Sequence, residues 1–234
     1  MPDAVAAAGH AGTAGTAGAH GHQHHPALQH HFETLEQQKE ASTLGMWIFI
    51  VQEVMFFGGL LMAYFLYRVW YPEAWTEGSR ELDILLGGIN TIVLIGSSLT
   101  MALAVRSAQV GSKKGTVNWL LITMVLGLVF LVIKFFEYKH KFDLNHIPGA
   151  NFVFEGPHAD QVQLFISLYF GLTGVHALHM VIGFVLLSVI AWMAHKDRFS
   201  PEWYTPVEMS GLYWHFVDIV WIFLFPLLYL VDRT

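Results

Sequence analysis

The sequence predicts an all-α protein, a polytopic membrane bundle of five transmembrane helices, and three observations carry that prediction. The 234-residue chain is 54% hydrophobic and only 13% charged, whereas about 25% of the residues in a water-soluble domain are charged. Five apolar runs are each about 20 residues long or longer, which is the length that spans a bilayer as a helix. These runs are continuous, so they lack the polar–apolar alternation of strands in a membrane barrel.

The first 43 residues lie outside the predicted bundle. Residues 1–31 repeat Ala, Gly and Thr and then continue into 20-HGHQHHPALQHH-31. Such a composition cannot bury a core, so we expect a disordered tail. Half of the chain's 14 histidines lie there, which leaves open metal capture, pH sensing or a solvated tail with adventitious metal affinity. Residues 32–43 are polar and helix-friendly and predict an amphipathic lead-in along the membrane surface. We expect no cleaved secretory signal, because no positively charged segment precedes a short apolar core.

The predicted transmembrane domain covers residues 44–234, and its five spans follow one another in order. They are residues 44–69, 85–105, 117–138, 162–194 and 207–231. The fourth span is long enough to tilt in the bilayer or to project from it. The connection 139–161 is rich in turn residues, and we expect it to cap one end of the bundle.

The distribution of basic residues predicts the orientation. The loop between the second and third spans holds Arg106, Lys113 and Lys114, the most compact basic cluster of the membrane domain. Because cytoplasmic loops carry an excess of Lys and Arg, we expect the N-terminus inside the cell and the C-terminus on the outer side.

Composition also excludes several kinds of site and partner. The chain has no cysteine, which excludes disulfides, covalently attached haem and any metal site that needs a thiolate. A metal would have to be held by His, Met or carboxylates. The net charge of −6 is small and scattered, so we expect no nucleic-acid partner.

Ionisable residues inside the spans are the candidate functional residues. Each costs roughly 2.5–3.5 kcal/mol at the centre of a bilayer, so none is expected to face lipid. They are Glu53, Lys134, Glu137, His176, His179, His215 and Asp218. Residues three or four apart share a helix face, so Lys134 can neutralise Glu137, His176 lies beside His179, and His215 and Asp218 share a stripe with Trp214.

Three interpretations of these residues are open at this stage. Glu53, His176 and His179 match the two histidines and one carboxylate of many non-haem iron sites, but an HxxH spacing alone is a weak motif. A proton relay would need titratable groups from one membrane surface to the other. We expect the third interpretation, in which the groups bond to one another and hold the helices together.

Five segments resemble one known family. They are 47-WIFIVQEVMFFGG-59, the polar residues Ser97, Ser98 and Thr100, the Glu137–Tyr138 pair, 173-TGVHALHMVIG-183 and 213-YWHFVDIVWIFLF-225. From Leu44 to its C-terminus the sequence resembles subunit III of the haem–copper terminal oxidases, of the cytochrome c oxidase type.

The resemblance implies a subunit without a catalytic centre in a proton-translocating oxidoreductase. Such a subunit carries no haem and no redox metal. It packs on subunit I, beside subunit II, and haem and copper are held by those partners. It is expected to bind phospholipid, to support proton uptake and to protect the enzyme during turnover. The implied location is the bacterial inner membrane, and a respiratory supercomplex is a further partner that the resemblance leaves open.

The resemblance also leads to a hypothesis about the candidate residues. The family carboxylate that matches Glu53 is buried beside the His-bearing span, so we expect Glu53 to bond to His176 or His179. We expect His215 and Asp218 to brace the bundle together with Trp214.

Two features depart from the family pattern. Longer members have seven spans and this chain has five, which puts in doubt the lipid cleft formed with the first two. Lys134 stands where many members have a neutral polar residue, so a Lys134–Glu137 pair is specific to this chain. The alternatives are subunit III of a quinol oxidase, a homologue associated with nitric oxide reductase, a stand-alone membrane metal or haem enzyme and, with no inverted repeat to favour it, a small transporter.

Overall fold

The computed structural model describes residues 27–231, except residues 145, 150, 151, 153 and 155. Most of the predicted disordered tail, residues 1–26, lies outside the described residues. Within the described part, the chain folds into six helices and contains no strand. The all-α prediction is therefore confirmed.

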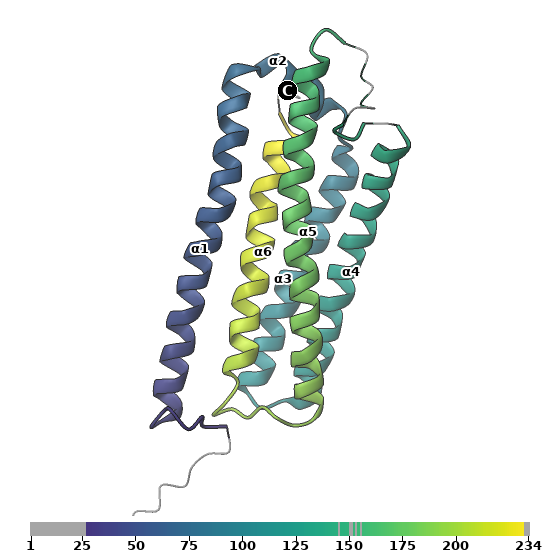
Figure 1. Ribbon diagram of the computed structural model, residues 1–234. Helices are drawn as coiled ribbons and strands as arrows, with labels where there is room; N and C mark the ends of the chain where they lie inside the picture. The colour runs from purple at the N-terminus through teal and green to yellow at the C-terminus, as the bar shows by residue number, and fades with distance from the viewer. Residues whose placement is uncertain (1–26, 145, 150–151, 153, 155, 232–234) are drawn as a thin grey trace, which may run out of the picture.

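Five of the six helices are long and run side by side along one axis, and the short helix α2 lies at one end of the bundle (Figure 1). The six are α1 (Leu35–Trp70), α2 (Pro72–Arg80), α3 (Ile84–Gln109), α4 (Lys113–Asp143), α5 (Ala159–His195) and α6 (Thr205–Tyr229). The five long helices are each apolar enough to cross a membrane, and they are the five predicted spans in the predicted order.

The helix boundaries differ from the predicted spans in two places. Helix α1 begins at Leu35, where the Thr34 side chain accepts a hydrogen bond from the Gln37 N–H at 3.1 Å and caps the helix. The segment predicted as a lead-in therefore continues into the first span without a break. Helix α2 was not predicted; it begins at Pro72, because proline is suited to the first turn of a helix and ends the one before it.

Helix α6 lies at the centre of the bundle and α1 lies at its edge. Helix α6 packs against α3, α5 and α1, whereas α3 and α4 pack mainly against each other. Only Glu53, Phe57 and Tyr64 are buried on α1, and they form a single stripe that contacts α5 and α6. Most of the other side chains along the membrane-spanning part of α1 are apolar and exposed.

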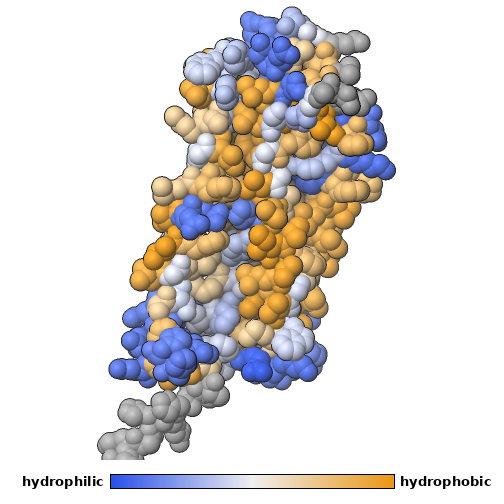
Figure 2. Space-filling model, in the orientation of Figure 1, coloured by the Kyte–Doolittle hydropathy of each residue, from blue (hydrophilic) through white to orange (hydrophobic). Residues whose placement is uncertain are grey.

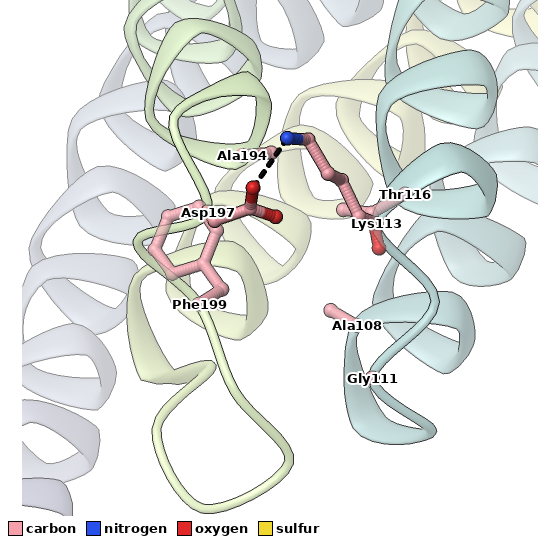
Figure 3. A pocket seen from close by; sticks show the side chains of 7 residues that line it. All are labelled: Ala108, Gly111, Lys113, Thr116, Ala194, Asp197 and Phe199. Carbon is pink, nitrogen blue, oxygen red and sulfur yellow. Dashed lines mark hydrogen bonds and ion pairs between the residues drawn. The ribbon is translucent and has the colours of Figure 1, made fainter.

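The turn between α3 and α4 meets the connection between α5 and α6 at one end of the bundle (Figure 3). Lys113 Nζ lies 2.5 Å from Asp197 Oδ2, and both side chains are exposed. Gly111 has a φ of 72°, and a Cβ atom there would lie 2.9 Å from Pro201. Two requirements therefore favour glycine at this position: the left-handed backbone conformation and the close approach of Pro201.

Between two hydrophilic ends the surface is mostly hydrophobic, with a small hydrophilic patch about halfway along the face in view (Figure 2). Exposed leucine, isoleucine, valine and phenylalanine side chains lie along all five long helices. Such an extensive apolar surface is much larger than a water-soluble monomer exposes, and it fits the hydrocarbon layer of a membrane.

Candidate functional site

Glu53 and His179 join α1 to α5 inside the apolar band. Glu53 is 9% exposed, and its Oε2 atom lies 3.1 Å from His179 Nε2. The other ring nitrogen, Nδ1, lies 2.8 Å from the Val175 carbonyl oxygen. A carbonyl can only accept, so Nδ1 carries a proton and donates it.

That assignment leaves one proton to share between His179 Nε2 and Glu53 Oε2. Either the imidazolium donates to the carboxylate or the carboxylic acid donates to the neutral imidazole, and both arrangements have zero net charge. The Tyr213 hydroxyl donates to the His179 backbone carbonyl at 3.0 Å, and the Phe57 ring lies 5.3 Å from the imidazole. The pair is thus neutral overall, and neighbouring aromatic side chains help to keep it buried.

Lys134 and Glu137 form a second buried pair, one turn apart on α4. The Nζ and Oε2 atoms are 3.0 Å apart. Tyr169 of α5 and Tyr229 of α6 donate to Glu137 Oε1 at 2.8 and 2.5 Å, and the Tyr229 oxygen accepts from Lys134 Nζ at 2.6 Å. Both ions are therefore hydrogen-bonded, which a buried ion pair requires, and the network holds three helices together.

Aromatic rings surround the Lys134 ammonium. Its Nζ lies 4.8 Å from the centroid of Trp221 and 5.1, 5.2 and 5.7 Å from those of Tyr169, Tyr229 and Tyr138. The negative faces of such rings attract a cation, most strongly where water is excluded.

His176 does not share the Glu53 carboxylate. It is fully buried, and neither ring nitrogen has a hydrogen-bond partner among the described residues. Its ring packs against Phe130 and Trp221, with centroids 5.4 and 5.2 Å apart. The expectation that every titratable group in the membrane finds a partner is therefore wrong for His176.

The third group lies between α3 and α6. The Trp214 indole N–H donates to Ser97 Oγ at 2.7 Å, and His215 Nδ1 lies 2.7 Å from Ser98 Oγ. The structure does not pair His215 with Asp218. Asp218 is 2% exposed, and neither carboxylate oxygen has a well-formed hydrogen bond among the described residues.

The predicted residues thus fall into three separate clusters. Glu53 meets His179 but not His176, Lys134 meets Glu137, and His215 and Trp214 bond to α3. Residue types alone did not identify Tyr169 and Tyr229 as partners. Their hydroxyl groups within apolar spans were the available signal, because a buried tyrosine O–H usually finds an acceptor.

Further contacts between basic or histidine side chains and carboxylates lie near the end of the bundle that carries α2. His158 lies 3.3 Å from both Glu73 and Glu77, and Lys141 and His146 both pair with Glu81. No group of three or more His, Asp and Glu residues in the described part of the chain is placed to hold a metal.

Comparisons with known proteins agree with this architecture. Residues 27–232 match the family model described as cytochrome c oxidase subunit III. The chain is 36% identical to cytochrome c oxidase subunit 3 of Synechocystis over 80% of this chain and 74% of that protein. It is 32% identical to quinol oxidase subunit 3 of Bacillus subtilis over 84% of this chain and 92% of that one. It is 30% identical to the haem–copper oxidase subunit I+III of Aeropyrum pernix, over 82% of this chain and 23% of that longer protein.

Proposed function

Since the chain belongs to the cytochrome c oxidase subunit III family of the haem–copper oxidases, we propose that it is the non-catalytic subunit of a respiratory cytochrome c oxidase. In this proposal haem and copper are held by subunits I and II, and this chain supports them. The observation that carries the proposal is the family match over residues 27–232, which includes all six helices.

The proposed main partner is subunit I. One relative, from Aeropyrum pernix, is named as a single subunit I+III chain, and a fused chain keeps its two parts in the same assembly. The many apolar side chains exposed on α1 and α3 give a partner helix a surface to pack against. A respiratory supercomplex would extend the same assembly.

Phospholipid is the second proposed partner. An apolar hollow with a volume of about 380 Å³ lies between α4 and α5 and is lined by Phe135, Tyr138, Phe142 and Phe170. Lys139 stands at the same hollow and is exposed. An aromatic wall for an acyl chain and an ammonium group for a phosphate favour a lipid there.

The Glu53–His179 pair is proposed to support proton uptake and to protect the enzyme during turnover. Both side chains are 11% exposed, and the pair shares one proton. The proton can move between His179 Nε2 and Glu53 Oε2 without changing the net charge of the pair. We expect the pair to contribute by holding α1 in its position against α5.

The proposed location is a bacterial inner membrane, with the α3–α4 turn in the cytoplasm. Lys113 and Lys114 lie at that turn, and α1 begins at the same end of the bundle (Figure 1). In this proposal the N-terminal end lies inside the cell and the end of α6 lies outside, as the positive-inside rule favours.

A tagged chain purified in mild detergent tests the proposal. We expect subunits I and II to co-purify and the mixture to show haem absorption. The chain expressed alone is expected to carry near-zero iron, copper and haem. Stoichiometric haem or metal on the isolated chain would instead favour a stand-alone membrane enzyme.

A quinol oxidase is the second candidate, favoured by the similarity to the Bacillus subtilis subunit. The electron donor is bound by other subunits, so the purified complex decides between the two. Rapid oxidation of reduced cytochrome c supports the first function, and oxidation of a quinol without cytochrome c activity supports the second.

A further inference from the structure

Three glutamates lie along one side of α2 and its C-terminal cap. Glu73, Glu77 and Glu81 follow one another at intervals of four residues, the spacing that brings side chains onto one face of a helix. Like charges at this spacing repel each other, and the C-terminal end of a helix disfavours a carboxylate. Positive charge from elsewhere in the fold is therefore needed to offset this repulsion.

His158, the residue that precedes α5, lies between two of these carboxylates. Its Nδ1 atom is 3.3 Å from Glu77 Oε1, and its Nε2 atom is 3.3 Å from Glu73 Oε2. A neutral imidazole carries one N–H and presents a lone pair at the other nitrogen, so one of the two carboxylates would face that lone pair. Carboxylates at both nitrogens therefore favour the imidazolium. The positive end of the α5 dipole opposes it, but with only about half a unit charge against two full negative charges.

His146 and Lys141 meet the third carboxylate. His146 Nδ1 lies 3.4 Å and Lys141 Nζ 3.6 Å from Glu81 Oε2, and Lys141 also donates to the Glu81 backbone carbonyl. These three residues and the three around His158 form one group of six side chains, which we call the histidine–glutamate cluster. Its three negative charges are balanced only when both histidines are protonated, because the lysine supplies a single positive charge.

Protons from the solvent can reach both histidines. The side chain of His158 is 34% exposed and that of His146 is 18% exposed, and His158 and Glu73 line a hollow of about 290 Å³. In the described part of the chain, no charged side chain outside the cluster lies within ion-pair distance of either histidine. The other charged and titratable side chains described at this end are Arg68, Arg80, Asp83, Lys139, His140, Asp143 and Asp160.

We propose that the histidine–glutamate cluster is a pH-responsive contact, in which proton uptake by His158 and His146 tightens α2 against α5 and the α4–α5 connection. Its contribution is present at low pH and is lost as the pH rises through the range, about 5 to 8, in which histidines change charge. The physiological meaning rests on the proposed function, since a proton-translocating oxidase acidifies the outer side of the membrane. The proposed orientation places α2 on that side.

The contact controls how firmly the outer end of α1 is held. Only Tyr71 separates α1 from α2, so a shift of α2 is passed directly to α1. Trp75 of α2 is fully buried and packs on Phe165 of α5, with ring centroids 5.5 Å apart. This apolar contact does not titrate, so α2 remains on α5 at high pH and the cluster adjusts its stability.

Amide hydrogen exchange of α2 in the assembled oxidase tests the proposal. Exchange rates of residues 72–80, divided by the intrinsic rates at each pH, report local opening of the helix. Between about pH 5.5 and about pH 8, on the two sides of the histidine titration, we expect protection to fall. The expected ratio is about three- to tenfold, as two partly exposed ion pairs predict. Equal corrected protection at the two pH values would overturn the inference.

A double variant assigns the effect to the two histidines. His158→Gln combined with His146→Gln is expected to show the low protection of the unaltered chain at high pH, with no change between the two pH values. His140→Gln is the matched control, because His140 is exposed at the same end of the bundle and lies outside the cluster. It should keep the pH dependence. A double variant with the unaltered pH ratio would refute the proposal.

Co-purification separates this inference from the proposed function. If the unaltered chain does not co-purify with subunits I and II, the proposed function fails, and exchange measured on the full chain in detergent still tests the contact. If the chain co-purifies but the protection of α2 is independent of pH, only the pH-responsive contact is wrong.

Discussion

At the scale of single residues, the ionisable groups in the membrane are held in different ways. Glu53 depends on one long-range partner, His179. Lys134 has a local partner, Glu137, and two tyrosines from other helices. Asp218 has at most one hydrogen-bond donor among the described residues, the Ser98 hydroxyl. The consequences of substitution should therefore differ among the three.

Glu53→Ala is expected to loosen the α1–α5 contact and shorten the working life of the oxidase, while haem content stays unchanged. The substitution leaves His179 Nε2 without a partner in a nearly closed site, at a cost of about 1–3 kcal/mol. Haem absorption and the half-life of activity during continuous turnover measure the two effects.

Glu53→Gln is the control for that experiment. Its amide can donate to the neutral His179 ring, so we expect a lifetime close to that of the unaltered enzyme. A loss of the haem signal in the alanine variant would contradict the structural role given to Glu53.

Lys134→Met should lower the thermal stability of the chain strongly, because it leaves Glu137 as an uncompensated buried carboxylate, at a cost of about 3–5 kcal/mol. The double variant Lys134→Met with Glu137→Leu removes both charges and should recover much of the loss. Thermal unfolding of the purified complex measures both. Lys114→Met, on an exposed lysine of the same helix, should change the free energy of unfolding by no more than about 0.5 kcal/mol.

At the scale of helices, glycines decide how closely α4 and α5 approach α6. A Cβ atom on Gly127 would lie 2.8 Å from the ring of Trp214, and one on Gly183 would lie 3.1 Å from the same ring. That ring donates to Ser97 on α3. The two glycines therefore make room for the side chain that joins the centre of the bundle to α3.

Gly127→Ala is expected to destabilise the bundle by about 1–3 kcal/mol, the usual cost of overpacking a core, because Trp214 has to move away from Ser97. A red shift of tryptophan fluorescence and a lower unfolding temperature would report it. Gly174→Ala, where a Cβ atom meets nothing within 4 Å, should be neutral or stabilising by about 0.5–1 kcal/mol. Equal effects of the two substitutions would contradict this account.

At the scale of the whole molecule, five spans place the two described ends of the chain on opposite sides of the membrane (Figure 1). Since the chain has no cysteine, single introduced thiols can report each side without background. Lys114 and Glu73 are exposed at opposite ends of the bundle.

We expect Lys114→Cys to react with a membrane-impermeant maleimide only in inverted vesicles, and Glu73→Cys to react in intact spheroplasts. The reason is the cluster of Lys and Arg at the α3–α4 turn, which the positive-inside rule places in the cytoplasm. Labelling of both thiols after detergent treatment controls for their reactivity. The reverse pattern would show that the orientation is inverted.

The sequence by itself determined the number, order and approximate limits of the membrane helices and the Lys134–Glu137 pair. These features are local: apolar run length sets a span, and a spacing of three residues sets a pair on one helix. It also identified the family, because the motifs are long and occur in order. It could not identify α2, since a nine-residue polar helix carries no membrane signal.

Only the tertiary structure decided which groups from different helices meet. His176 and His179 lie on one stripe of α5, and sequence spacing left both as partners for Glu53. The position of α1 against α5 selects His179 and leaves His176 between Phe130 and Trp221. In the same way, the packing of α6 against α3 brings His215 within hydrogen-bond distance of Ser98. The structure shows no hydrogen bond between His215 and Asp218. Contacts between helices depend on their relative rotation and register, which are set by the packing of all the helices together and not by any one segment.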